Sequence, residues 1–256
     1  MKKLAAVFMM AVIVMSLFGC SGSKDDEANA PTQAEDTSSA QDGTQKDQES
    51  LISTPKDLVL KETGWSVFSD SLGTKWVTYG AVVENPNDSY AAKNFQIRVT
   101  ARNTAGTVVG TSSYYGYVLW AKESVGCGDG MSLAGDVDKV EFELIVQEGS
   151  WAMLTSFEAS GYKSLSIINQ NISKDDYSIR FLGEVKNANN FDIISVQVSA
   201  LFRGTDGKIT GGFFTYSDIA FKNGGTSPFT GYAYYKDVPY KTVDFYALQS
   251  AIPKIS

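Results

Sequence analysis

The sequence contains no histidine among its 256 residues. This absence removes the usual proton carrier near neutral pH, the base of Ser or Cys nucleophile triads, and a common nitrogen ligand of zinc. Carboxylate pairs are the enzyme route that remains, since a glycoside hydrolase needs only two acids. Two pairs, Asp136 with Asp138 and Asp175 with Asp176, stand in turn-like stretches, and we interpret them as solvated loop charge. We therefore expect a protein that is not an enzyme and uses no cofactor.

Cysteine is nearly as scarce, with Cys20 and Cys127 alone. Cys127 stands between glycines in Gly126-Cys127-Gly128, within a stretch from 122 to 130 that we predict to be a loop. A thiol there is either exposed for intermolecular pairing or half buried in a turn, and both alternatives stay open. If Cys20 is modified, as argued below, no disulfide within the chain is available.

Basic residues are outnumbered, 22 against 29 acidic ones, for a formal charge of −7. Such a balance makes nucleic acid and anionic lipid surfaces poor partners. Asp129, Asp136 and Asp138 offer the oxygen ligands that calcium prefers, but their spacing matches no dedicated calcium loop. We expect no metal site.

Apolar residues are missing from one long segment, because residues 21–50 contain no Val, Leu, Ile, Met or aromatic residue. Such a composition cannot bury a core and favours disorder. We predict an acidic, disordered tether over residues 20–56. About thirty flexible residues span on the order of 30 Å.

The first twenty residues have the pattern of an export signal. Lys2 and Lys3 precede a nearly unbroken apolar run from Leu4 to Phe18, which is short for a membrane span. The run ends in Leu17-Phe18-Gly19-Cys20, which resembles a bacterial lipobox, with Phe18 in place of the usual small residue. The resemblance implies a signal peptide over 1–19, a diacylglyceryl group on Cys20, and an anchor on the extracytoplasmic face of a bacterial membrane. An ordinary secretory signal or an uncleaved anchor helix are the alternatives.

The remainder of the chain repeats itself. Residues 80–110 and 182–211 share a Val-x-Asn-x-Asn string and a later Thr-x-Gly turn. The Gly of the turn follows the first Asn of the string by 21 residues in one copy and by 20 in the other. Apolar residues alternate in both copies, which predicts half-buried strands. The predicted core-facing positions are Val77, Tyr79, Ala81, Val83, Phe95, Ile97, Val99 and Ala101 in one copy, and Ile179, Phe181, Gly183, Val185, Val196, Val198, Ala200 and Phe202 in the other.

Short alternating strands separated by turn signals predict an all-β chain with two tandem immunoglobulin-like β-sandwich domains. We place the first domain at 57–147, a linker at 148–156, the second domain at 157–249 and a tail at 250–256.

The second copy resembles the FxLyD-type domains of bacterial extracytoplasmic lipoproteins, through Gly183-Glu-Val-Lys-Asn187 and Asp206-Gly207-Lys208-Ile209. The first copy departs from that pattern at Ala81 and Ala105. The resemblance implies immunoglobulin-like domains with little assigned biochemistry.

Aromatic residues supply the candidate binding site. If Val118 and Trp120 point inward, an outward row remains on the opposite strand faces, formed by Tyr115, Tyr117, Phe214 and Tyr216. Such a row stacks on sugar rings or forms a protein interface, or it is covered where the two domains pack together or by the linker between them.

These patterns predict a non-catalytic, lipid-anchored cell-envelope protein that acts as an interaction or spacer module. The alternative is a carbohydrate- or peptide-binding lipoprotein that uses the aromatic row. The expected partners are the membrane, through the anchor, and an envelope protein or glycan, but no nucleic acid.

Overall fold

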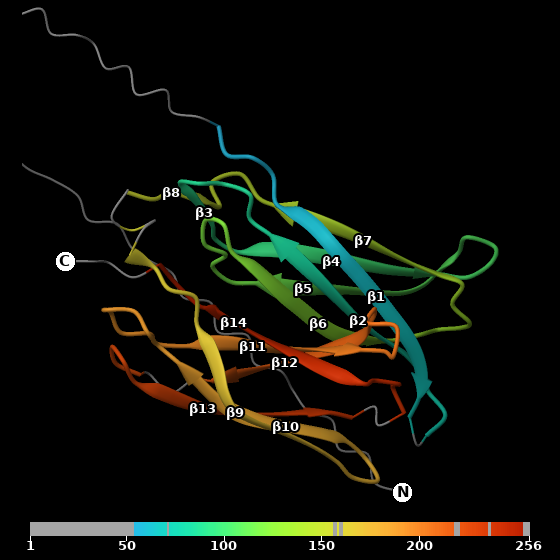
Figure 1. The fold of residues 1–256 in the computed structure, drawn as a ribbon. Coiled ribbons are helices and arrows are strands. Elements are labelled where there is room, and N and C mark those ends of the chain that lie inside the picture. Colours follow the sequence, from blue (N-terminus) through green and yellow to red (C-terminus); the bar gives the residue numbers. More distant parts are fainter. Residues whose placement is uncertain are drawn as a thin grey trace, which may run out of the picture. The chain divides into compact units, whose positions relative to one another are not determined.

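The computed structural model describes residues 54–252, apart from 71, 156–157, 159–160, 218–220 and 235–236. The chain is all-β, as predicted, and every pairing between its strands is antiparallel. The first copy of the repeat and the segment after it form eight strands (Figure 1): β1 (Val59–Ser69), β2 (Lys75–Glu84), β3 (Tyr90–Ala92), β4 (Phe95–Arg102), β5 (Val108–Gly116), β6 (Ser124–Ser132), β7 (Lys139–Val146) and β8 (Trp151–Met153). The second copy forms six: β9 (Ser166–Lys174), β10 (Ile179–Lys186), β11 (Val196–Arg203), β12 (Ile209–Ser217), β13 (Thr226–Ala233) and β14 (Thr242–Gln249).

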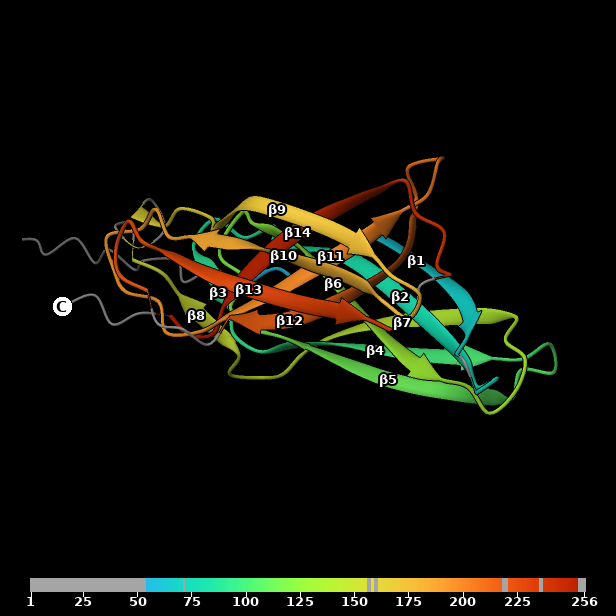
Figure 2. The same ribbon diagram turned by 90° about the horizontal axis from the view of Figure 1, so that it is seen from below.

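Each copy builds two three-stranded sheets in the same order. The first copy has sheets β1-β2-β6 and β5-β4-β7, and the second has β9-β10-β13 and β12-β11-β14. Figure 2 shows β13, β10 and β9 lying side by side. The two sheets of each copy enclose one apolar core, so the fold contains two β-sandwich bodies.

The alternation predicted from the sequence is observed. The four apolar residues of β2 and the four of β4 named above are buried in the first core. Their counterparts on β10 and β11 are buried in or beside the second core. The Thr-x-Gly turns connect β4 with β5 and β11 with β12, and Gly106 and Gly207 each have a φ of 79°, a conformation that glycine adopts at little cost.

The repeated Asn-x-Asn string holds a loop in each copy. The Asn85 side chain donates to the carbonyls of Tyr90 and Leu119, and its oxygen accepts from the Asn87 backbone and side chain. Asn87 then exchanges two hydrogen bonds with the Lys56 backbone, just before β1. In the second copy, Asn187 and Asn189 make the corresponding bonds to loop carbonyls and to Lys163, just before β9. Because an unpaired buried amide is costly, these bonds fix both loops.

The two copies are not matched on their outer faces. On β4 the outward Arg98 is exposed, whereas on β11 the equivalent face, with Gln197, Ser199 and Leu201, is fully buried. This face is buried because β12, β11 and β14 lie against β1, β2 and β6 of the first copy. Sheet β12-β11-β14 therefore has a packed layer on both sides.

Glycines bring these two sheets together. A Cβ added to Gly128 would lie 2.6 Å from the Gly212 Cα, and one added to Gly64 would lie 1.9 Å from the Ile209 carbonyl oxygen. Real Cβ atoms do not approach that closely, so the backbones meet where side chains are missing. Thr78 completes the contact, since its hydroxyl donates to the Gly212 carbonyl and accepts from the Gly212 N–H, both at 3.0 Å.

The predicted loop over 122–130 is wrong, because β6 occupies most of it. Val125, Cys127 and Met131 point into the first core, and the alternate positions are glycines that face the second copy. The glycines were interpreted as loop residues, whereas they serve a strand that another sheet approaches closely.

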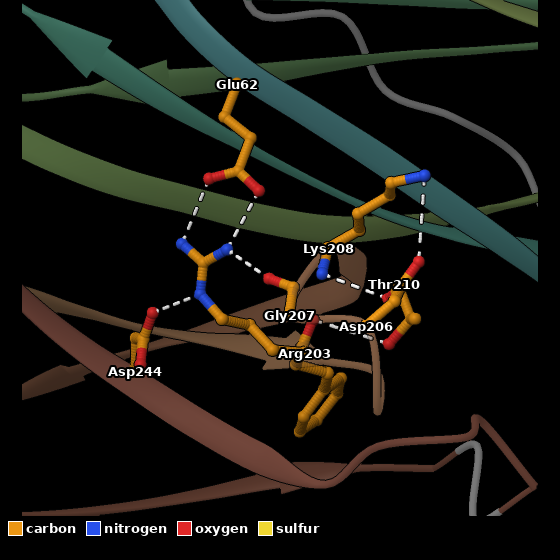
Figure 3. A network of polar contacts seen from close by, with 8 residues as sticks. Glu62, Arg203, Asp206, Gly207, Lys208, Thr210 and Asp244 are labelled. Atoms are coloured by element: carbon orange, nitrogen blue, oxygen red, sulfur yellow. Dashed lines mark hydrogen bonds and ion pairs between the residues drawn. The ribbon is translucent and has the colours of Figure 1, made fainter.

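A charged clamp also joins the copies (Figure 3). The Arg203 guanidinium donates to both carboxylate oxygens of Glu62 on β1, at 2.8 and 3.0 Å, and also to Asp244 on β14 and to the Gly207 carbonyl. These bonds raise the pKa of Arg203, which stays charged. Its repeat counterpart, Arg102, makes the equivalent bonds to Glu141 and the Gly106 carbonyl within the first copy. The bond to Glu62 is the one that crosses between copies.

Both copies belong to one compact unit, and the domain limits given above stay a prediction. Part of the proposed linker is β8, which pairs with β3. Over the residues that the structure describes, no helix is long and apolar enough to cross a membrane.

Replacing Gly128 with Ala tests the close sheet approach. We expect the unfolding free energy to fall by about 1–3 kcal/mol, since the added methyl meets backbone atoms that no rotamer change relieves. Urea unfolding followed by circular dichroism measures the change. Gly135→Ala is the control, because its Cβ would meet only Val109, at 3.7 Å. Equal unfolding midpoints for both variants would contradict the proposed contact.

Replacing Arg203 with Met tests the clamp, with Arg102→Met as the matched variant. The partners of Arg203 are more than a third exposed, so we expect a loss of only about 1 kcal/mol. Arg102→Met should lose less, because it breaks no pair between the copies. Urea unfolding at low and high salt measures both, and a larger loss for Arg102→Met would overturn the interpretation.

Candidate functional site

The structure brings three of the four predicted aromatic residues together. The Tyr117 and Tyr216 ring centroids are 6.1 Å apart, and the Phe214 ring meets the Tyr216 ring edge-on at 5.5 Å. Tyr117 follows β5 in the first copy, while Phe214 and Tyr216 come from β12 in the second. The row therefore lies across the junction of the two copies.

The fourth residue, Tyr115, is the most exposed, at 64%, against 40% for Tyr216. Tyr117 and Phe214 are half buried and pack against the first core. Val118 and Trp120 point inward, as expected. Two of the four rings are therefore exposed, and the other two are partly covered by neighbouring residues.

Polar contacts under the row also cross the junction. Tyr114 is buried, and its hydroxyl shares a 3.0 Å hydrogen bond with the Ser199 hydroxyl of β11. Gln197 donates its amide to the Tyr115 carbonyl at 3.2 Å. The half-buried rings thus help to hold the copies together, and Tyr115 with the outer part of Tyr216 remain for a ligand.

The two cysteines have different outcomes. Cys20 lies outside the described residues. Cys127 is 1% exposed in β6, opposite Ala81, and burial raises the pKa of its thiol. Both alternatives given for Cys127, exposed or half buried in a turn, are therefore wrong, because it lies in the core within a strand. A protonated, inaccessible thiol does not react readily.

The carboxylate candidates serve turns and ion pairs. The carboxylate of Asp136 pairs with the Lys75 ammonium, whose hydrogen bond lowers the pKa of Asp136. Asp175 accepts from the backbone N–H groups of Tyr177 and Ser178, each at 2.7 Å. No group of three or more Cys, Asp or Glu side chains that could hold a metal ion is found in the described part of the chain.

Sequence reasoning missed one half-buried acid, Glu123. Burial raises the pKa of Glu123 to about 7, so its protonated and ionised forms are both populated near neutral pH. The Tyr162 hydroxyl donates to one oxygen at 3.4 Å, and the Trp120 backbone N–H donates to the other at 3.3 Å. The Trp120 and Tyr162 rings stack at 4.2 Å. Beside Lys122, this Glu has no sequence signal that separates it from surface charge.

Sequence reasoning also missed a pocket between the two copies. It has a volume of about 230 Å³ and is lined by residues of β1, β2, β6 and β12 and by the segments that follow β1 and β13: Phe68, Asp70, Trp76, Asp129, Gly130, Phe213 and Tyr234. Phe68 and Trp76 are direct partners in the β1–β2 pairing, and their rings stack with centroids 6.4 Å apart. Four aromatic residues, two from the β1–β2 hairpin and two from the second copy, therefore meet in one cavity.

Asp70 supplies the charge of this pocket. Its Oδ2 accepts from the Trp76 indole N–H at 3.0 Å, and its Oδ1 accepts from the Leu72 and Thr74 backbone N–H groups at 2.9 Å. These bonds, that from Trp76 foremost, lower the pKa of Asp70, so the carboxylate is ionised at neutral pH. Asp129 is the second acidic residue of the lining, and burial raises the pKa of its carboxyl group. Asp70 is therefore the acid whose negative charge the surrounding hydrogen bonds stabilise.

Comparison with known proteins assigns no family. No protein-family profile matches the chain, and the search of curated proteins finds no match. Among solved structures, the red sea bream transglutaminase aligns with 77% of this chain and 32% of its own, at 12% identity and a TM-score of 0.22. A calcium-binding mutant of β-glucuronidase 2 from Bacteroides uniformis aligns with 69% of this chain and 24% of its own, at 14% identity and a TM-score of 0.19. The chain spans a third or less of either protein, and the similarity is distant.

Proposed function

We propose that the chain is a non-catalytic, lipid-anchored protein of the bacterial cell envelope, which acts as an interaction or spacer module. In this proposal Cys20 carries the lipid, residues 20–56 form the tether, and two immunoglobulin-like sandwiches of the FxLyD type form the folded part. The basic start, the apolar run and the Leu17-Phe18-Gly19-Cys20 string support the anchor. The repeated Asn-x-Asn loops support the assignment of both copies to one domain type.

The observation that carries the module interpretation is the burial of both faces of β11. Two domains that moved independently would leave the outer face of that strand in water. Here Gln197, Ser199 and Leu201 are covered by the other copy, and glycine contacts and the Arg203 clamp hold the two sheets in place. A rigid double sandwich on a flexible tether suits a protein that presents a surface at a set distance from the membrane.

The state of the acidic groups supports a function without catalysis. A carboxylate pair must leave both acids available to a substrate. Asp136 is held by Lys75, and Asp175 caps its own turn. With histidine absent, we propose neither an enzyme activity nor a cofactor, and the acidic balance argues against nucleic acid as a partner.

The alternative function uses the aromatic row as a glycan- or peptide-binding surface. The exposure of Tyr115 and Tyr216 favours it, since aromatic faces stack well on sugar rings. The ring contacts of Tyr117 and Phe214 favour the structural interpretation. Of the two functions, the interaction or spacer module agrees better with the partial burial of the aromatic row.

Lipidation is tested in cells that express the full chain beside a Cys20→Ala version. We expect the membrane fraction to contain a mature protein that begins at Cys20 and carries acyl mass, because multiple acyl chains on one residue make a stable anchor. Mass spectrometry of that fraction measures it. Cys20→Ala should lose the acyl mass and the processing. A soluble wild-type protein cut elsewhere would contradict the anchor.

The aromatic row is tested by the double change Tyr115→Ala with Tyr216→Ala. We expect unchanged retention on immobilised peptidoglycan fragments and a stability loss of about 1 kcal/mol from the ring contacts of Tyr216. For a domain of this size, the loss corresponds to a melting temperature lower by about 2–4 °C. Tyr177→Ala, at a tyrosine that is 78% exposed, is the control. The alternative would be established if the wild type were retained on the fragments and the double variant were not, with the same melting temperature for both.

A further inference from the structure

The pocket between the copies contains chemistry that the proposed function does not use. Its walls are the rings of Phe68, Trp76, Phe213 and Tyr234, and the rest of the lining is Gly130 and two acids, Asp70 and Asp129. Phe68 is buried and Trp76 half buried, whereas Tyr234 is 71% exposed. An exposed ring beside buried ones indicates a cavity that is open to ligands on the side of Tyr234.

The pocket follows from the glycine contact. Where Gly128 meets Gly212, the two sheets are at backbone contact, and the next residue of β12 is Phe213. On the facing strands, Phe68 and Trp76 occupy the last positions on the side of the second copy. The facing strands thus have glycines in the middle of their contact and large rings at one end. Between these rings a space remains that the side chains line but do not fill.

The electrostatics of this space favour a cation. Asp70 is ionised, and among the ion pairs between described residues none involves it. Its hydrogen bond from the Trp76 indole draws the N–H proton toward the carboxylate, which makes the ring face more negative. Aromatic faces attract cations within about 6 Å, and tryptophan does so best.

A neighbouring ring already binds a cation in this way. The Arg180 guanidinium lies 5.8 Å from the centroid of the Tyr232 ring, and the Tyr232 ring stacks on Tyr234 at 6.2 Å. The Tyr232 ring therefore connects this intramolecular cation–π contact to Tyr234, which forms one wall of the pocket. Inside the pocket, the described side chains include no Lys or Arg.

Other ligand classes fit less well. An anion would meet the charge of Asp70 and the negative ring faces. A sugar needs several hydrogen-bond partners, whereas both oxygens of Asp70 already accept bonds from the protein and the remaining walls are mostly carbon. The volume is below the roughly 300–1,000 Å³ of pockets for drug-sized ligands, which indicates a small group.

We propose that the pocket formed by Phe68, Asp70, Trp76, Phe213 and Tyr234 binds a small organic cation with a methylated ammonium group. Methyl groups contact the rings, and the positive charge is balanced by Asp70 and by the ring faces, with no need for hydrogen bonds. The proposal does not depend on the lipid anchor or on the aromatic row of Tyr115, so its failure would leave the proposed function unaffected.

The test is a titration of the full chain, labelled with ¹⁵N-tryptophan, with choline chloride. The indole N–H resonance of Trp76, assigned with Trp76→Phe, should shift and saturate, while those of Trp120 and Trp151 stay in place. The matched ligand is 3,3-dimethylbutanol, an uncharged carbon analogue of choline, and sodium chloride at equal ionic strength controls for salt. We expect the uncharged analogue to bind at least about tenfold more weakly, since a difference of about 1.4 kcal/mol is tenfold in affinity.

Two variants locate the site. Asp70→Asn keeps an acceptor for the Trp76 indole and removes the charge, so choline affinity should fall about tenfold. Asp88→Asn removes a carboxylate outside the pocket, one that pairs with Lys122, and should bind as the wild type does. Tyr234→Ala provides a second variant if Asp70→Asn disturbs its turn, because so exposed a ring can be removed without unfolding the protein; it should also weaken binding about tenfold.

Three results would overturn the proposal. The first is that the Trp76 indole resonance does not shift at tens of millimolar choline. The second is that choline and its uncharged analogue bind equally. The third is that Asp70→Asn and Tyr234→Ala both fold and both bind choline as the wild type does. Saturable binding that prefers choline and is weakened by either variant would support it.

Discussion

Close approach of two sheets is the constraint on which this structure depends. Sheets that pack through side chains lie about 10 Å apart, whereas here Gly128 and Gly212 bring backbones into contact. At that separation the Thr78 hydroxyl reaches both polar groups of the Gly212 backbone. The Arg203 clamp at one side and the Tyr117, Phe214 and Tyr216 cluster at another are then possible, because their partners come from different copies.

Duplication explains the parts that the copies share, and the junction explains the parts that differ. Asn85 and Asn187 make the same bonds to their loops, and Arg102 and Arg203 make the same bonds to their turns. Departures occur where the copies touch. Arg98 of β4 is exposed, whereas the outer face of β11 carries the buried, uncharged Gln197, Ser199 and Leu201 and ends in Arg203, which pairs with Glu62 of the first copy. Each copy kept its core, and one outer face of each became an interior.

A junction built from backbone contacts, a charged clamp and rings has consequences for function. It makes two sandwiches into a single body, as the proposed interaction or spacer module requires. It also creates the aromatic pocket, since Trp76 and Phe213 belong to different copies and meet only there. The junction is thus both the mechanical link of the proposed module and its most distinctive chemical feature.

The sequence by itself determined the all-β class, the repeat, the core-facing residues and the turn glycines. These are local properties, because strand alternation and positive φ depend on near neighbours. Tertiary structure decided whether the outer face of each strand meets water or another sheet. The glycines of β6 have the composition of a loop until another sheet lies against them, and the period of two is the same whether a face meets water or protein. Glu123, the clamp to Glu62 and the pocket around Trp76 depend on residues brought together from distant parts of the chain, so no local pattern could reveal them.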